Sequence, residues 1–137
     1  MGEVSIGKMY GLKAIKLGKE KYPIQVWYNA LIKKKESELT VADVLHMFRQ
    51  GICMSLALKK ALDYLEQDIW SGELYDGELF EKLTTLEQIN LKNNIYRIRR
   101  IIAIAKEEGV IHYWDSDEER NDFFNLVETL ETKIKGD

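Results

Sequence analysis

The stretch GELYDGEL, residues 72–79, lies between two runs of sequence that both have the pattern of helices. Glycine costs a helix about 1 kcal/mol relative to alanine, so its two glycines predict a turn, with Asp76-Gly77 as the site of a positive φ angle. Tyr75 and three carboxylates lie in the same stretch. We therefore predict a shaped, acidic corner between two helices.

The helical pattern begins well before this corner. Pro23 is the only proline, and a proline in the first helical turn costs no hydrogen bond, so we predict a helix that begins there. Thr40 and Asp43 have the spacing of a capping box, which predicts a second helix from Val41 to Gln50 that Gly51 ends. The predicted apolar face of the first helix consists of Ile24, Trp27, Tyr28, Leu31 and Ile32.

Three further apolar stripes recur at three- and four-residue steps. They consist of Met54, Leu58, Ala61, Leu62, Leu65 and Ile69; of Leu91, Ile95, Ile98, Ile101, Ile102 and Ala105; and of Phe123, Phe124, Val127, Leu130 and Ile134. Thr84 or Thr85 is the predicted cap of the helix that carries the second of these stripes, and Gly109 is its predicted stop. Asp115 or Ser116 is the predicted cap of the last helix.

Two short segments are less regular. Residues 110–114, VIHYW, are interpreted as an extended link rather than a strand. Residues 9–12, MYGL, are predicted to form either a short strand or a clasp over the helices. The whole pattern predicts an all-α fold: a single domain over residues 1–137, forming a compact bundle of about five to six helices with an irregular N-terminal segment.

Composition bears on location. No apolar run approaches the ~20 residues of a membrane span, so we expect no membrane segment. The first residues lack the basic-then-apolar layout of a signal peptide. The single cysteine, Cys53, cannot form an internal disulfide. A reducing cytoplasm is therefore the expected location.

The net charge of −3 conceals four blocks of charge. Residues 1–35 hold eight lysines against two glutamates, and residues 92–106 hold five basic residues and no acidic one. Residues 63–87 hold eight acidic residues against one lysine, and residues 107–131 hold nine against one arginine. These blocks either neutralise one another in the folded chain or form a polarised surface that steers a charged partner.

The spacing of the cysteine and the two histidines gives little support for a nucleophilic or metal site. Cys53 and His46 are seven residues apart with Gly51 between them, so we interpret Cys53 as a buried structural cysteine. His112 lies in an aromatic stretch, which favours a packed histidine over a metal ligand. We therefore predict no enzyme activity.

Two alternatives use charged residues. The first is a metal-dependent hydrolase acting through Glu73, Asp76 and Glu78; their spacing matches no calcium loop, however, and caps or a partner's cations are the preferred interpretation. The second is a nucleic-acid face formed by Lys92, Arg97, Arg99, Arg100 and Lys106. The acidic net charge favours a solvated face or pairing with the acidic blocks, so we expect neither nucleic acid nor a cofactor.

Three sequence segments form a recognisable order: LTVADV at residues 39–44, Arg49-Gln50, and WSGELYDGEL at residues 70–79. In this order residues 39–85 resemble the small helical immunity proteins of contact-dependent growth inhibition (CDI) systems, which protect bacteria against toxins delivered by their neighbours. The last segment is the most specific part of the resemblance. Its motif positions here are Arg49, Gln50, Gly72, Tyr75, Gly77 and Glu78.

The resemblance implies a protein that binds one cognate toxin and blocks it, without enzyme activity. The expected partner is the C-terminal domain of the toxin; many such toxins are nucleases, whose basic clefts would attract the acidic blocks. The alternative is a helical adaptor or regulatory module that uses the same acidic surface. Trp70 and Tyr75 flank the corner, and aromatic residues beside charge are favoured interface hot spots. The candidate partner-binding or motif residues are Arg49, Gln50, Trp70, Glu73, Tyr75, Asp76 and Glu78.

Overall fold

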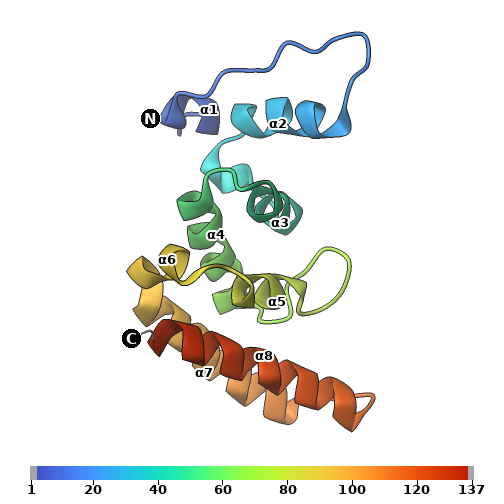
Figure 1. Cartoon of the computed structure of the whole chain (residues 1–137), viewed down its shortest axis with the longest axis vertical. Coiled ribbons are helices and arrows are strands. Elements are labelled where there is room, and N and C mark those ends of the chain that lie inside the picture. The colour runs from blue at the N-terminus through green and yellow to red at the C-terminus, as the bar shows by residue number, and fades with distance from the viewer. Residues whose placement is uncertain (1–2, 136–137) are drawn as a thin grey trace.

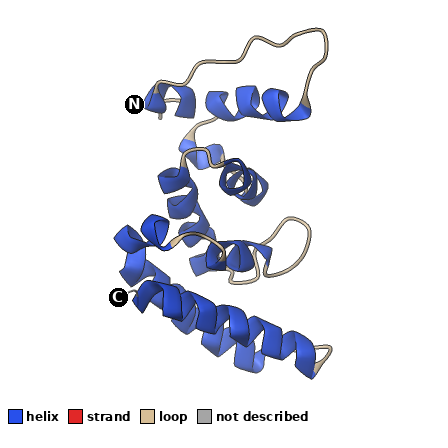
Figure 2. Ribbon diagram, viewed as in Figure 1, coloured by secondary structure: helices blue, strands red, loops and turns tan. Residues whose placement is uncertain are grey.

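The computed structural model describes residues 3–135, and its regular elements are all helices (Figure 1, Figure 2). They are α1 (Ile6–Tyr10), α2 (Pro23–Lys33), the 3₁₀ helix η1 (Glu36–Glu38), α3 (Val41–Gln50), α4 (Met54–Gln67), α5 (Glu78–Thr84), α6 (Gln88–Leu91), the 3₁₀ helix η2 (Lys92–Asn94), α7 (Ile95–Ile111) and α8 (Asp117–Lys135). The all-α prediction is confirmed. Within the described range six α-helices have seven residues or more, in agreement with the predicted number.

The helices are arranged in three tiers along the long axis of the molecule (Figure 1). α1 and α2 form one end, α3 and α4 form the middle, and the antiparallel pair α7 and α8 forms the other end. α5 packs against α3, α4 and α8, and therefore joins the middle tier to the last. Its Leu79, Phe80 and Leu83 are fully buried, as are Leu62 and Leu65 of α4.

The N-terminal segment is irregular, as predicted, but the short strand proposed for residues 9–12 is wrong. Met9 and Tyr10 form the end of α1, and Gly11 closes that helix with a φ angle of 65°. A loop over residues 11–22 follows and crosses above α2 (Figure 1). The Asn29 side chain on α2 holds this loop, since it accepts from the backbone N–H of Ile15 at 2.7 Å and donates to the Ile15 carbonyl at 2.8 Å.

The apolar face predicted for α2 is only partly buried. The backbone N–H of Ile6 donates to the Lys34 carbonyl at 2.8 Å, which fixes α1 beside the C-terminal end of α2. Leu31 and Ile32 are buried at this end. Ile24 lies at the other end of the helix and is 41% exposed, so its assignment to the buried face was wrong.

Three helix ends predicted from local chemistry, at Pro23, Thr40 and Gly51, are confirmed. Pro23 lies in the first turn of α2. The Thr40 hydroxyl accepts from the backbone N–H of Asp43 at 3.1 Å, and the Asp43 carboxylate accepts from the backbone N–H of Thr40 at 3.0 Å. Lys34 adds an ion pair to Asp43 at 2.6 Å. Gly51 ends α3 with a φ angle of 67°.

The predicted cap by Thr84 or Thr85 is wrong. Both hydroxyls donate backwards to carbonyls three residues earlier, at 2.6 Å to Glu81 and 2.7 Å to Lys82. These threonines therefore belong to the end of α5, and the next helix begins only at Gln88. The apolar stripe that follows is divided between α6, which holds Leu91, and α7, which holds the rest, and η2 lies between them.

Gly109 does not end its helix, because α7 continues to Ile111. A Cβ atom at Gly109 would lie 2.8 Å from the ring of Phe123 and 2.8 Å from that of Phe124, both on α8. Gly109 thus allows α7 and α8 to approach closely. The sequence alone did not distinguish this packing role from a helix stop.

The turn between α7 and α8 is an extended link, as predicted, although it covers residues 112–116 rather than 110–114. The Ser116 hydroxyl accepts from the backbone N–H of Glu119 at 3.1 Å, so Ser116 rather than Asp115 caps α8. Acidic residues fill the first turn of α8, where the helix dipole favours negative charge.

Candidate functional site

The corner between α4 and α5 is closed by backbone hydrogen bonds between its two ends. The N–H of Gly77 donates to the Trp70 carbonyl at 2.8 Å, and the N–H of Leu79 donates to the Ser71 carbonyl at 3.1 Å. These bonds fix the path of the residues between them, and the corner is therefore a defined structure rather than a loose loop.

Both glycines of the corner are required by its geometry. Gly77 has a φ angle of 86°, which confirms the positive φ predicted there. A Cβ atom on Gly72 would lie 2.0 Å from the Tyr75 carbonyl oxygen, far inside van der Waals contact. Gly72 therefore permits a close approach of two backbone segments, and Gly77 permits a left-handed turn.

Glu78 is bound within the corner itself. One oxygen of its carboxylate accepts from the backbone N–H groups of Glu73 at 2.8 Å and Leu74 at 2.9 Å. The Glu78 residue is only 8% exposed. Its place in the motif is thus explained by the turn that it stabilises, and this oxygen is already occupied as an acceptor.

Tyr75 ties the middle of the corner to α5. Its hydroxyl donates a hydrogen bond to the Glu81 carboxylate, and this bond, with the negative charges of Glu81 and Glu78 and partial burial, raises the pKa of Tyr75 to about 12. The Tyr75 side chain is still 52% exposed. One edge of the tyrosine is therefore fixed while the rest remains available at the surface.

Trp70 lies at the centre of an aromatic cluster that joins the corner to the last tier. Its ring centroid is 4.2 Å from that of His112, 5.0 Å from that of Phe123 and 5.7 Å from that of Trp114. The Trp114 indole N–H donates to the Gly109 carbonyl at 2.8 Å. The prediction that His112 is a packed histidine is confirmed.

A pocket opens beside this cluster, with a volume of about 430 Å³. We call it the acidic pocket. The carboxylates that line it come from both acidic blocks of the sequence: Asp76, Glu81, Asp115, Glu119 and Asp122. Its aromatic lining consists of Trp70, Tyr75, His112, Tyr113, Trp114 and Phe123.

Four of these carboxylates, on Asp76, Asp115, Glu119 and Asp122, are exposed and form no ion pair within residues 3–135. The two acidic blocks are visible in the sequence, but the sequence does not show that they lie at one pocket. Each block has a tryptophan beside its acidic residues, and that shared pattern was the available signal.

The remaining candidate residues lie outside the acidic pocket. Arg49 and Gln50 are exposed at the end of α3, and no ion pair among the described residues involves Arg49. Glu73 is exposed on the corner but is not part of the pocket lining. Of the predicted set, the structure brings Trp70, Tyr75 and Asp76 to one pocket.

The cysteine and the other histidine lie elsewhere. Cys53 is half-buried at the start of α4, where burial raises the pKa of its thiol. His46 stacks on Trp27 with a centroid distance of 5.4 Å. In the part of the chain that the structure describes, no group of three or more His, Cys, Asp or Glu side chains is arranged to hold a metal ion.

Some of the basic residues of 92–106 neutralise acidic residues, one of the two outcomes left open by the sequence. Arg97 on α7 binds Asp63 at 2.8 Å and Glu66 at 3.1 Å on α4. Lys106 binds Glu131 on α8 at 2.8 Å. These ion pairs connect α7 to α4 and α8, so Arg97 and Lys106 of the possible nucleic-acid face contribute to the packing of the helices.

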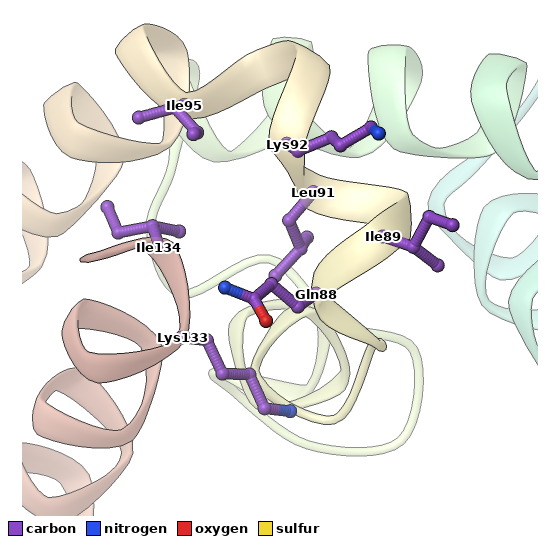
Figure 3. Close-up of a pocket in the computed structure, with 7 residues that line it drawn as sticks. All are labelled: Gln88, Ile89, Leu91, Lys92, Ile95, Lys133 and Ile134. Atoms are coloured by element: carbon purple, nitrogen blue, oxygen red, sulfur yellow. The ribbon is translucent and has the colours of Figure 1, made fainter. Parts of the chain in front are cut away.

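A second pocket lies at the opposite end of the α7–α8 pair, where α6 meets the C-terminal end of α8 (Figure 3). We call it the Ile134 pocket; its volume is about 350 Å³. Lys92 and Lys133 line it together with Ile89 and Ile134. The ammonium group of Lys133 donates to the backbone carbonyls at the end of α5 and therefore acts as a structural cap.

Comparison with known proteins supplies the family. A sequence profile described as CDI immunity proteins matches residues 8–101 of the 137. No curated protein matches the chain. Among the described helices none is long and apolar enough to cross a membrane. The matched range contains residues 39–85, on which the resemblance is based. Because the match covers more than half of the chain, the chain belongs to the family of CDI immunity proteins.

Proposed function

We propose that the chain neutralises one cognate toxin by binding it in a stoichiometric complex, without catalysis. Membership of the CDI immunity family carries this proposal, since the family implies a cognate CDI toxin as partner. The proposed partner is the C-terminal domain of that toxin, and the proposed place of action is the cytoplasm.

The charge distribution supports a toxin that acts on nucleic acid. A nuclease binds its polyanionic substrate through a basic surface. The acidic pocket offers the complementary charge, with four exposed carboxylates that pair with no cation of the described chain. Such complementarity raises the association rate and disfavours wrong partners.

The test is co-expression with the C-terminal region of the product of the adjacent upstream gene. We expect a one-to-one complex by size-exclusion chromatography with light scattering, and we expect cells that make this toxin region to grow when the chain is present. An unrelated acidic helical protein of similar size is the control. Absence of both complex and protection would contradict the proposal and favour the adaptor alternative.

A further inference from the structure

We propose that the acidic pocket receives one lysine or arginine side chain of the cognate toxin. This inference rests on the proposed function, because it names the surface and the chemistry by which the toxin would be held.

The lining suits a long cationic side chain. Indole and phenol rings attract a cation at their faces, tryptophan most strongly, and this attraction increases when the site is partly desolvated. Trp70, Trp114 and Tyr75 supply these rings, while the carboxylates of Asp76 and Asp122 supply acceptors for an ammonium or guanidinium group. A volume of about 430 Å³ is well within the range of ligand pockets and leaves room for such a side chain.

The fold uses only part of the charge at this pocket: Glu81 accepts a hydrogen bond from Tyr75, and Glu119 lies in the first turn of α8. Some acidic residues elsewhere have internal partners: Asp63 and Glu66 bind Arg97, and Glu131 binds Lys106. The exposed carboxylates of the acidic pocket form no ion pair within the described chain. Clustered negative charge repels itself unless a cation is supplied, and the toxin is the partner that the family implies.

The family profile matches one wall of the acidic pocket but not the other. Trp70, Tyr75 and Asp76 lie inside the matched range of residues 8–101, whereas the wall formed by residues 112–126 lies outside it. A site built from both walls combines a part of the chain that the family profile matches with a part that it does not match. Specificity for one cognate toxin is a difference between affinities for similar partners, and the second wall offers contacts outside the matched range that contribute to such a difference.

The Ile134 pocket does not suit the same ligand. Lys92 and Lys133 line it, as Figure 3 shows, and like charge would repel a lysine or arginine. Nothing about its apolar lining indicates a cationic occupant. We therefore expect changes in the acidic pocket to weaken toxin binding and changes in the Ile134 pocket to leave it unaltered, so the Ile134 pocket serves as an internal control.

The test is calorimetric titration of the full chain with the purified toxin domain. We expect Asp76→Asn combined with Asp122→Asn to weaken binding at least about tenfold, as truncation of one partner in a close interfacial charge pair does. The matched control is Glu128→Gln, which also removes one exposed charge from α8 but lies outside the acidic pocket. It should change the affinity by about twofold or less, and Lys92→Gln in the Ile134 pocket should do the same.

The reciprocal experiment changes each lysine and arginine of the toxin to methionine. We expect one of these toxin variants to weaken binding to the unaltered chain about tenfold and to have little further effect on the Asp76/Asp122 double variant, because the two sets of changes remove the same interaction.

Three results would overturn the inference. If Glu128→Gln reduces the binding free energy by as much as each of the two pocket substitutions does on average, general charge attraction explains the effect. If the pocket variants bind normally while the unaltered chain binds tightly, the toxin docks elsewhere and only the proposed function stands. If the unaltered chain does not bind the toxin, the proposed function fails and the inference fails with it.

Discussion

The Tyr75 hydroxyl donates a hydrogen bond to the carboxylate of Glu81, which ties the exposed middle of the corner to α5. This bond and the nearby charge raise the pKa of Tyr75 from 10.0 to about 12. The folded state therefore holds the phenolic proton more tightly than the unfolded state, so the bond contributes stability below about pH 10 and that contribution is lost as the pH rises through about 12.

Tyr75→Phe is the corresponding test. We expect the variant to lose up to about 1 kcal/mol of unfolding free energy at neutral pH, because the bond is partly exposed. The difference between the two proteins should shrink between about pH 10 and 12 when both are measured by denaturant unfolding. Parallel stability curves over that range would show that the hydroxyl is not held by Glu81.

The glycines of the corner should not tolerate alanine, each for its own reason. Gly72→Ala places a Cβ atom 2.0 Å from the Tyr75 carbonyl oxygen, so the backbone must move and the corner should lose about 3 kcal/mol or more. Gly77→Ala keeps the space but forces a left-handed conformation, at a cost of about 1–2 kcal/mol. Gly18→Ala has open space and no positive φ, and it should leave the melting temperature unchanged. A smaller effect at Gly72 than at Gly77 would contradict this ranking.

Glu78 should be required for the corner even without a toxin. Glu78→Ala leaves the backbone N–H groups of Glu73 and Leu74 without their acceptor, and we expect a loss of about 1–3 kcal/mol in unfolding free energy. Glu78→Gln keeps one acceptor oxygen but removes the charge, so its loss should be roughly half as large. Amide hydrogen exchange at Glu73 and Leu74 should accelerate in the alanine variant. Equal stability of the two variants would indicate that the carboxylate does not serve as their acceptor.

Local chemistry made several elements predictable. The capping pair Thr40 and Asp43, the left-handed Gly51 and the turn at Gly77 each depend on residues within four positions of one another, and each appears in the structure as expected. The acidic character of the corner was likewise visible in sequence.

Long-range contacts explain what the sequence did not show. Gly109 has the local signature of a helix stop, but its role depends on Phe123 of the next helix. The acidic pocket lies where Trp70 packs against His112, 42 positions later in the chain. Each segment has a tryptophan beside acidic residues, but this shared pattern does not specify that the two segments pack together.

Asp43 should couple stability to acidic pH. Burial by itself would raise the pKa of its carboxyl, but hydrogen bonds from the Lys34 ammonium group and from Thr40 hold the pKa below the usual 3.8. This stabilisation is present above about pH 4 and is lost as the pH falls through the lowered folded-state pKa. Asp43→Asn should therefore cost about 1–2 kcal/mol at neutral pH, and the gap in unfolding free energy should narrow below about pH 4. If the difference in unfolding free energy between the two proteins does not change with pH, the loss of stability comes from packing rather than from the charge of Asp43.

Gly109→Ala tests whether close helix packing or helix propensity dominates. In an exposed helix this change stabilises by about 1 kcal/mol. Here the new methyl group would lie 2.8 Å from the rings of Phe123 and Phe124, and Phe123 is buried against Trp70, so overpacking should cost about 1–3 kcal/mol. We expect a net loss of stability, together with a change in tryptophan fluorescence as the aromatic cluster shifts. The control is Ala103→Gly, at an exposed position of α7, which measures helix propensity alone. If Gly109→Ala raises the unfolding free energy by as much as Ala103→Gly lowers it, then α8 moves to accommodate the methyl group without cost.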